Sequence, residues 1–206
     1  ALDHFKAFGA IVEEVSIPLH LEAPALLTPI YFEGGTQTMM HGDGYGVSRS
    51  DLFSTSLMDF HRNWRVRANE LPPTVKLVTL LGTYIRKNHG SRYYGKSINL
   101  TRMLRAAYDE KLSNYDLLVM PTTAAKAQAI PQPGASIMEV VQSALPLYLN
   151  GNTQPFNATH HPAMAVPCGM SEGLPISLML IGKHFDEPTI YRAAHAFQES
   201  IDWKTI

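Results

Sequence analysis

The sequence predicts an α/β fold in which a mixed, largely buried sheet is flanked by helices. Short apolar runs at residues 117–120 and 174–181 are bounded by proline or glycine, which is typical of buried strands. Between these runs and after them, apolar residues recur at helical spacing. Strands that alternate with helices along a chain of 206 residues favour one domain with an at least partly parallel sheet.

The first segment combines a helix end with a strand pattern. Leu2, Phe5 and Phe8 recur at helical spacing, and Gly9 is typical of a helix C-terminus. Residues 11–18 alternate in polarity, so we expect a strand there. A helix already under way at the first residue also leads us to expect that the chain is cut from a larger unit.

The middle of the chain is predicted to be a helical scaffold. Residues 21–46 favour a helix followed by a glycine-rich loop. Over residues 51–69 the apolar side chains fall on one helical face, before two prolines. Two further helices are expected over residues 74–89 and 94–115, with Gly90 as the stop signal between them.

Helix signals also follow the first apolar run. Ser136 and Glu139 have the spacing of a capping box, in which the side chain of each residue bonds the backbone N–H of the other. This pattern predicts a helix that begins near Ser136. After the second apolar run, Asp186 is the expected N-cap of a closing helix with Pro188 in its first turn.

Composition argues against several classes of protein. Charged residues make up 17% of the chain, against about 25% in typical soluble domains. We therefore expect part of the surface to be covered by a partner chain, by the rest of a longer chain, or by a second copy in a homo-oligomer. A net charge of −1 without a basic run argues against nucleic-acid binding. A single cysteine, with no signal-peptide pattern and no bilayer-spanning apolar run, predicts a cytoplasmic protein that does not enter a membrane.

Residues 152–169, NTQPFNATHHPAMAVPCG, hold a dense set of polar and reactive side chains. Cys168 with His160 and His161 suggests a thiol nucleophile, but Cys168 ends an apolar run in which we expect it to be packed and inert. One cysteine and two adjacent histidines lack the ligand spacing of a zinc site, so we expect no metal and no cofactor. We expect Asn152 and its Asn and Thr neighbours to bond the backbone of their own loop.

Five segments resemble, in order and at similar separations, the C-terminal part of the amidase signature enzymes. They are FGAIVEEVSIPLH, YDLLVMPTT, NTQPFNATHHPAMAVPCG, GLPISLMLIG and EPTIYRAAHAFQE. The resemblance extends over almost the whole chain. Residues 56–85 look most like the amide hydrolases that accompany nitrile hydratase.

The resemblance implies a hydrolase that attacks an amide carbonyl with a serine, and a chain that forms part of a larger amidase-signature fold. In the family a lysine and a second serine activate the nucleophile, and backbone N–H groups stabilise the oxyanion. These groups lie in a Gly/Ser-rich signature N-terminal to the matched region, and the sequence contains no such stretch. We therefore assign no catalytic residue to this chain. We expect it to be inactive without a missing N-terminal catalytic half.

The same resemblance implies where a small-molecule amide substrate would bind. In related amidases the residues before the NT-x-PF loop line the acyl side of the cleft, and those positions correspond to Leu147 and Asn150. Tyr45, in the glycine-rich loop, is the third candidate. The family usually has Thr-Gly-His-Pro where this chain has His160 in place of the glycine, so the local turn and the pocket width are not assumed to be identical.

Two other hypotheses stay open. The chain can be a non-catalytic binding or structural module derived from an amidase. The mass of the intact purified protein separates this hypothesis from an amidase, because a partner with a Ser/Gly-rich signature would appear beside the chain. A Cys/His hydrolase centred on Cys168 is the other hypothesis, and iodoacetamide labelling of the folded protein tests it.

Overall fold

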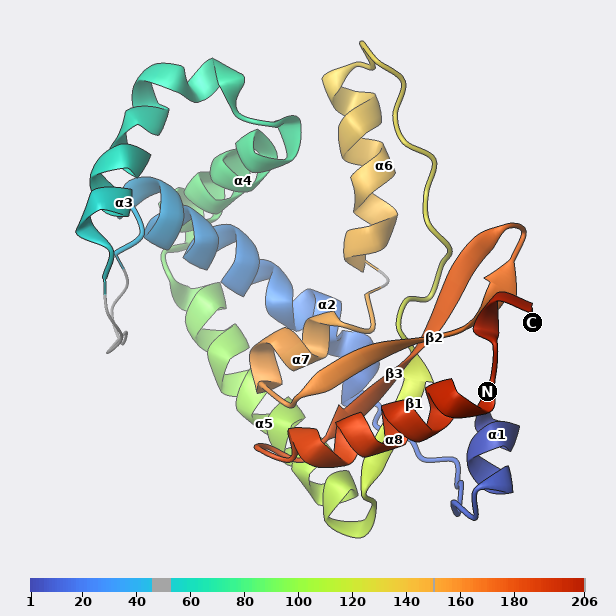
Figure 1. The fold of residues 1–206 in the computed structure, drawn as a ribbon. Coiled ribbons are helices and arrows are strands. Elements are labelled where there is room, and N and C mark those ends of the chain that lie inside the picture. Colours follow the sequence, from blue (N-terminus) through green and yellow to red (C-terminus); the bar gives the residue numbers. More distant parts are fainter. Residues whose placement is uncertain (46–52, 150, 206) are drawn as a thin grey trace. The chain divides into compact units, whose positions relative to one another are not determined.

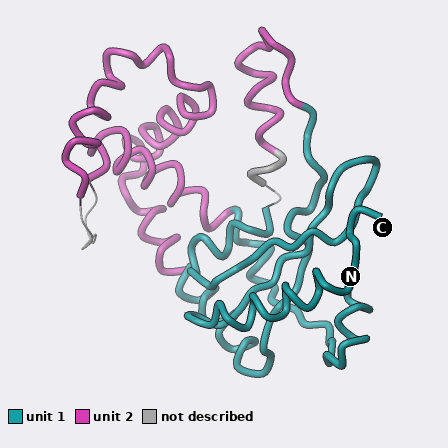
Figure 2. Tube along the Cα trace, viewed as in Figure 1, with its two compact units in different colours: residues 1–24, 101–129, 146–206 teal, residues 25–100, 130–145 magenta. Residues whose placement is uncertain are grey.

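A computed structural model describes residues 1–45, 53–149 and 151–205 (Figure 1). The chain divides into two compact units (Figure 2). Unit 1 contains residues 1–24, 101–129 and 146–206, and unit 2 contains residues 25–100 and 130–145. Three segments that are distant in sequence therefore build unit 1.

The strands of unit 1 form an antiparallel sheet with the order β1-β3-β2. β3 (Leu174–Gly182) pairs on one side with β1 (Leu117–Pro121) and on the other with β2 (Ala163–Ser171). The predicted α/β architecture with helices around the sheet is confirmed, but every pairing among the described strands is antiparallel. β2 and β3 are joined by only Glu172 and Gly173, both with positive φ, and such a two-residue hairpin turn reverses the chain.

Helix α8 (Glu187–Ser200) packs against β2 and β3 and closes the core of unit 1 (Figure 1). Phe5 of helix α1 (Leu2–Ala7) stacks on Phe197 of α8, with 5.1 Å between ring centroids. Apolar residues at helical intervals on α8 therefore meet alternate residues of the strands. The buried residues of this core are Val166, Leu178, Leu180, Ile190, Ala194 and Phe197.

Residues 11–18 do not form the predicted strand. Gly9 ends α1 with a φ of 87°, as expected, but the segment after it pairs with no described strand and Ile11 is 88% exposed. Alternating polarity indicates a face that can be buried, whereas a strand also needs a neighbour for its backbone hydrogen bonds. That neighbour is absent from the described part of the chain, so the strand prediction is wrong here.

β2 is a strand that the sequence did not indicate. Pro167 interrupts its apolar run, and proline is unusual inside a sheet. The pairing passes from Pro167 opposite Ser177 to Gly169 opposite Ile176. This β-bulge accommodates the proline and lets the strand continue to Ser171.

Helix α5 (Arg92–Asn114) contributes its C-terminal part to unit 1. Its residues Leu104, Tyr108 and Leu112 are buried at helical spacing. The ring of Tyr108 lies 5.0 Å from that of Phe156, in the short helix α7 (Gln154–Thr159), measured between centroids. The last described element is a 3₁₀ turn, Trp203–Thr205.

One uninterrupted helical segment is longer than expected; its residues 19–24 belong to unit 1 and the rest belongs to unit 2. Helix α2 (Leu19–Pro29) continues through two π-helical stretches, η1 (Ile30–Gly34) and η2 (Thr36–His41). Helix α4 (Pro73–His89) packs against both π-helical stretches. Gly90, with a φ of 61°, ends α4 as predicted. Among the described residues, no helix combines the length and the apolar character that crossing a bilayer requires.

Gly82 allows α4 to approach η1 and η2 closely. A Cβ atom at this position would lie 2.1 Å from the carbonyl oxygen of Phe32 and 2.3 Å from Oγ1 of Thr36. Thr36 is fully buried, and its hydroxyl donates a hydrogen bond to the carbonyl of Val78 at 3.1 Å. Only glycine therefore leaves room for this contact.

The helix predicted over residues 51–69 is divided in two. Helix α3 (Thr55–His61) is followed by a 3₁₀ segment, η3 (Arg62–Glu70), while residues 51 and 52 lie outside the described part. The apolar side chains of this segment are not all buried: Leu57 is 63% exposed and Phe60 is 69% exposed. The amphipathic pattern therefore marks a face that the described residues leave open.

Both predicted N-caps can be compared with the structure. At the start of helix α6 (Ile137–Leu149), the Ser136 N–H donates to Glu139 Oε2 at 2.7 Å, and the Glu139 N–H donates to Ser136 Oγ at 3.3 Å. The capping box is confirmed, and these hydrogen bonds lower the pKa of Glu139. Asp186 makes no side-chain cap to the backbone of α8, because its Oδ1 accepts the hydroxyl hydrogen of Thr189 at 2.8 Å instead.

Candidate functional site

Of the three residues predicted to line the acyl pocket, Tyr45 is the one whose side chain lies in the described part of the chain. Tyr45, in unit 2, is 59% exposed, and its ring stacks on Phe53 with 6.3 Å between centroids. Leu147 belongs to helix α6 and to unit 1, but its side chain lies outside the described part, as does all of Asn150. The pocket wall therefore stays a prediction.

The polar stretch at residues 152–169 contains helix α7, and the residue that follows this helix has an unusual backbone conformation. His160 has a φ of 63° and a ψ of 20°, in the left-handed region, and its N–H donates to the carbonyl of Phe156 at 2.8 Å. Glycine adopts this conformation without steric cost, and it is the commonest residue just after a helix. The glycine that amidase signature enzymes usually have at this position would fit the same turn.

Asn152 connects three segments of unit 1. Its Nδ2 donates to the carbonyl of Pro121 at 2.7 Å, and its Oδ1 lies 3.2 Å from Nε2 of His20. The other ring nitrogen of His20 lies 2.6 Å from the hydroxyl of Tyr108. Burial raises the pKa of Tyr108, so the phenol remains neutral. The amide of Asn152 thus bonds distant segments, and not its own loop as predicted.

A second polar group surrounds His161, whose side chain is fully buried. Its Nδ1 lies 3.0 Å from Oγ1 of Thr159, and its Nε2 lies 3.1 Å from Oδ1 of Asp109. The ring of His184 lies 4.1 Å from the His161 ring, between centroids. Burial lowers the pKa of His161, the hydrogen bond to Asp109 opposes that shift, and the proximity of His184 adds to it.

Sequence reasoning singled out His161 but missed the residues around it. Asp109 lies on α5, and His184 lies in the turn between β3 and α8. Neither residue has a spacing from His161 that indicates a shared site. Only the pairing of β2 with β3 and the packing of α5 bring the three side chains together.

Cys168 lies at the bulge of β2, between the paired positions of Pro167 and Gly169. Its side chain is partly buried and packs against the core of unit 1. This placement agrees with the predicted packing role and does not favour a nucleophile.

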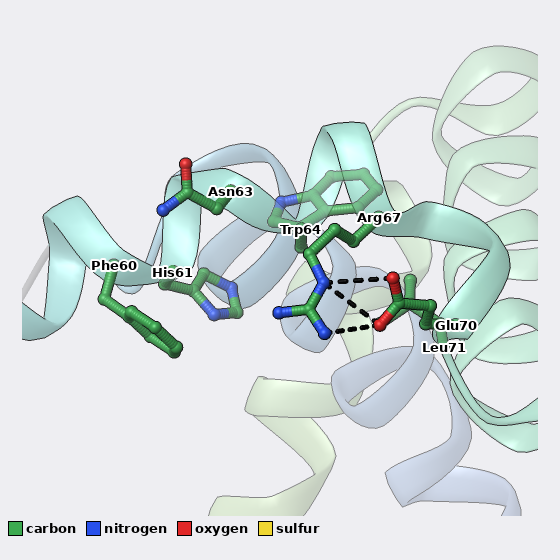
Figure 3. Close-up of a pocket in the computed structure, with 7 residues that line it drawn as sticks. All are labelled: Phe60, His61, Asn63, Trp64, Arg67, Glu70 and Leu71. Atoms are coloured by element: carbon green, nitrogen blue, oxygen red, sulfur yellow. Dashed lines mark hydrogen bonds and ion pairs between the residues drawn. The ribbon is translucent and has the colours of Figure 1, made fainter.

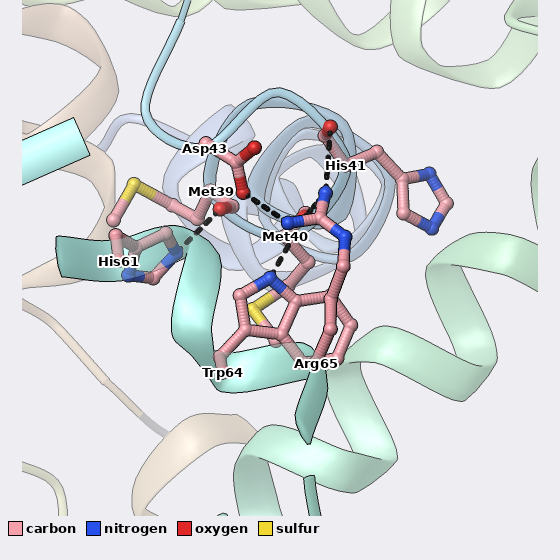
Figure 4. A network of polar contacts seen from close by, with 7 residues as sticks. All are labelled: Met39, Met40, His41, Asp43, His61, Trp64 and Arg65. Carbon is pink, nitrogen blue, oxygen red and sulfur yellow. Dashed lines mark hydrogen bonds and ion pairs between the residues drawn. The ribbon is translucent and has the colours of Figure 1, made fainter. Parts of the chain in front are cut away.

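In unit 2, donors from α3 and η3 meet the C-terminal end of η2 (Figure 4). The last carbonyls of a helix lack partners within it and carry partial negative charge, so donors and cations are favoured there. Nε1 of Trp64 donates to the carbonyl of Met40 at 3.1 Å, and Nε2 of His61 lies 2.7 Å from the carbonyl oxygen of Met39. These contacts hold η3 against η2.

Arg65 adds a cation to the same helix end (Figure 4). Its guanidinium donates to the carbonyls of Met40 and His41, each at 3.3 Å, and to Oδ1 of Asp43 at 2.6 Å. The hydrogen bond from Arg65 lowers the pKa of Asp43. Because the guanidinium bonds groups of the protein itself, we interpret this network as structural.

An open pocket of about 200 Å³ lies along α3 and η3 (Figure 3). Nε of Arg67 lies 3.0 Å from both carboxylate oxygens of Glu70, so the two charges of the pocket are paired. Ligand pockets commonly measure about 300–1,000 Å³, and we assign no ligand to this smaller one. Its lining residues are Phe60, His61, Asn63, Trp64, Arg67, Glu70 and Leu71.

A family model described as Amidase matches residues 1–191 of the chain. The chain belongs to the amidase family. The match includes all three described strands and extends into α8. The family membership expected from the five resembling segments is therefore confirmed.

The chain covers different shares of the proteins that it resembles in sequence. It is 38% identical over 168 residues to a protein of the nthA 5′ region of Rhodococcus erythropolis, with 81% of this chain and 83% of that protein covered. It is 38% identical over 192 residues to an enantioselective amidase of Rhodococcus rhodochrous, with 92% of this chain and 37% of that protein covered. It is 34% identical over 207 residues to a glutamyl-tRNA(Gln) amidotransferase subunit of Lysinibacillus sphaericus strain C3-41, with 98% and 40% covered.

Solved structures of two hydrolytic enzymes share the fold of the chain. A 6-aminohexanoate cyclic dimer hydrolase matches with a TM-score of 0.69 and 18% identity, over 98% of this chain and 40% of that one. A bacterial aryl acylamidase of the amidase signature family matches with a TM-score of 0.67 and 17% identity, over 98% and 39%. The chain thus spans about two fifths of the length of these enzymes, and it contains part of the larger amidase fold.

Proposed function

We propose that this chain is the C-terminal part of a serine amidase that hydrolyses a carboxylic amide to an acid and ammonia. The observation that carries the proposal is the Amidase match over residues 1–191, in a chain that spans only 37% of the enantioselective amidase. The sequence lacks the Gly/Ser-rich stretch that would supply the nucleophile and the oxyanion donors. The contribution of the chain is then a scaffold and one wall of the acyl pocket, without a catalytic residue of its own.

The partner in this proposal is the missing N-terminal catalytic half. The low proportion of charged residues, 17%, supports a covered surface. So do Leu57 and Phe60, which are largely exposed although their helix is amphipathic. We further propose that the assembled enzyme is cytoplasmic and homo-oligomeric, with a dimer as the simplest form, and that it acts on a small-molecule amide without nucleic acid, membrane or cofactor.

For the acyl pocket we keep Leu147, Asn150 and Tyr45 as the proposed lining residues. Ligand pockets are mostly apolar with a few polar groups that set orientation. Leu147 suits the apolar part, while the amide of Asn150 and the phenol of Tyr45 suit the polar part. The support for Leu147 and Asn150 is their place before the NT-x-PF segment, which the chain has at residues 152–156.

Ammonia release from acetamide or benzamide tests the proposal. We expect the isolated chain to release none, and a mixture of the chain with the missing N-terminal half to release ammonia. A heat-killed mixture is the control for background. Hydrolysis by the isolated chain above this background would show that the chain contains its own catalytic groups.

One observation favours a second candidate function. The chain covers 83% of the Rhodococcus erythropolis protein, whereas it covers 37% of the enantioselective amidase. A relative that short is compatible with a non-catalytic binding or structural module derived from an amidase. The mass of the intact purified protein separates the two candidates, because an amidase requires a catalytic half in the same or a second chain.

A further inference from the structure

Three metal-ligating side chains converge in unit 1, away from the proposed acyl pocket residues in the sequence. Oδ1 of Asp109 lies 3.1 Å from Nε2 of His161 and 3.7 Å from Nε2 of His184. All three donor atoms lie within 4.8 Å of one another. Two imidazoles and one carboxylate form a ligand set that suits zinc and neighbouring divalent transition metals.

The two distances from Asp109 to the histidines are close to those expected around a common ion. Nitrogen and oxygen ligands bind zinc at about 2.0–2.2 Å. Two ligand atoms whose bonds to the ion make an angle of about 90–110° are then about 3.0–3.5 Å apart. The distance from Asp109 to His161 lies in this range, and the distance from Asp109 to His184 is only slightly longer. His184 lies in a turn and its side chain is 29% exposed, so its ring can rotate to close the remaining gap.

A hydrogen bond to the second ring nitrogen of His161 fixes the orientation of its ring, as is usual for metal-bound histidines. Its Nδ1 lies 3.0 Å from Oγ1 of Thr159, which is fully buried. When Nδ1–H donates to that oxygen, the lone pair of Nε2 faces Asp109. Metal-bound histidines commonly have such a partner on their second nitrogen, because it fixes the tautomer and the ring orientation.

His184 supplies an independent sign of an absent partner. Its Nε2 atom is buried and has no hydrogen-bond partner among the described residues. A buried polar atom without a partner costs free energy. A cation between Asp109, His161 and His184 would give this nitrogen a partner, and it would also explain why two imidazoles point at one carboxylate oxygen. Arg105 contributes a positive charge near His161 that works against a cation, and the Asp109 carboxylate compensates for it.

We propose that Asp109, His161 and His184 bind one divalent transition-metal ion of the zinc class. The ion joins α5, the segment just before β2 and the turn after β3, so it stabilises the packing of α5 on the sheet region of unit 1. The side chain of Asp109 is 51% exposed, which gives the ion access from solvent and leaves its other coordination positions to water. The proposal does not depend on amide hydrolysis.

Cobalt binding to the purified full-length protein, after dialysis against a chelator, tests this site. We expect one equivalent of Co²⁺ to produce visible d–d absorption that Zn²⁺ abolishes by displacement. Asp109→Asn and His184→Gln should each weaken binding at least tenfold, because each removes one of three ligands. His195→Gln, at an exposed position on α8, is the matched control and should bind like the wild type.

Two further readouts do not depend on cobalt absorption. Zn²⁺ should raise the thermal midpoint of the wild type but not that of His184→Gln, because a ligand that binds only the folded state stabilises it. In the wild type alone, Zn²⁺ should shift the Nε2 resonances of two histidines. The proposal is overturned if the wild type shows no stoichiometric cobalt absorption, or if an Asp109→Asn/His184→Gln double variant binds cobalt as the wild type does.

Discussion

His160 shows at the scale of a single residue how backbone conformation selects a side chain. It ends α7 in the left-handed region, with a φ of 63°, and its side chain is exposed. A residue with a Cβ atom is strained in this conformation by about 1–2 kcal/mol relative to the right-handed one. Glycine avoids that strain but loses more conformational freedom on folding.

We therefore predict that His160→Gly raises the free energy of unfolding by about 0.5–1 kcal/mol. This is the left-handed strain that glycine relieves, minus the additional conformational entropy that glycine loses on folding. Urea denaturation followed by circular dichroism measures the change. His195→Gly is the control, because a glycine in place of histidine inside α8 should lower stability by about 0.3–0.5 kcal/mol, the difference in helix propensity. If both variants lose stability, His160 does not adopt the left-handed conformation in solution.

Asn150 is the residue at which we expect substrate choice to be decided. An unpaired amide beside an apolar acyl chain costs about 1–3 kcal/mol. Asn150→Ile in the complete enzyme should therefore shift kcat/KM toward bulky apolar amides by roughly tenfold or more. The measurement compares a polar and an apolar amide of equal size, and their kcat/KM values should change in opposite directions. Asn157→Ile, at an exposed position of α7, is the control. If the kcat/KM values of both substrates change in the same direction, Asn150 does not line the acyl pocket.

At the scale of elements, the contact of α4 with η1 and η2 depends on one glycine. A Cβ atom at Gly82 would lie within 2.3 Å of atoms of both Phe32 and Thr36. The Phe32 oxygen is a backbone atom and the Thr36 side chain is buried, so neither atom can turn away. Helix α4 must therefore move away from η1 and η2 to admit a Cβ atom at Gly82. Gly95, in α5, has nothing within 4 Å of its Cβ position and offers a matched site.

Gly82→Ala should lower the free energy of unfolding by about 1–3 kcal/mol, as overpacked cores do. Gly95→Ala should raise it by about 0.5–1 kcal/mol, because alanine favours the helix and fits the space. Chemical denaturation of both variants checks the pair. Equal effects of the two substitutions would mean that α4 does not approach η1 as closely as described.

At the scale of the whole molecule, the exposed apolar face of α3 allows a test of whether a catalytic half covers it. Leu57→Ser should change the free energy of unfolding of the isolated chain by less than about 0.5 kcal/mol, because its side chain is already exposed. If the catalytic half covers Leu57, the same substitution should weaken association by roughly tenfold or more, since burying a leucine contributes about 1.5–3 kcal/mol.

Titration of the N-terminal half into each variant by calorimetry measures this association. Asp59→Ser, an exposed polar position on the same helix, is the control and should leave the affinity unchanged. Equal affinities for all three proteins would place the catalytic half elsewhere on the chain.

The sequence by itself determined several local elements and the family. Gly9 and Gly90 end helices, the capping box of Ser136 and Glu139 begins one, and the apolar runs of β1 and β3 are strands. Each of these features depends on residues a few positions apart, so a local pattern is sufficient to predict it. The order of the five resembling segments is likewise a property of the sequence, and it is sufficient to indicate the amidase family.

Only the tertiary structure decided which distant residues meet. The segment at residues 11–18 looks like a strand but has no described neighbour, whereas β2 looks irregular and becomes a strand because β3 pairs with it across a bulge. Asp109, His161 and His184 likewise converge only because α5 and the two loops meet in unit 1. A strand requires a partner and a metal site requires convergent donors, and both are properties of contacts between distant segments that no local pattern records.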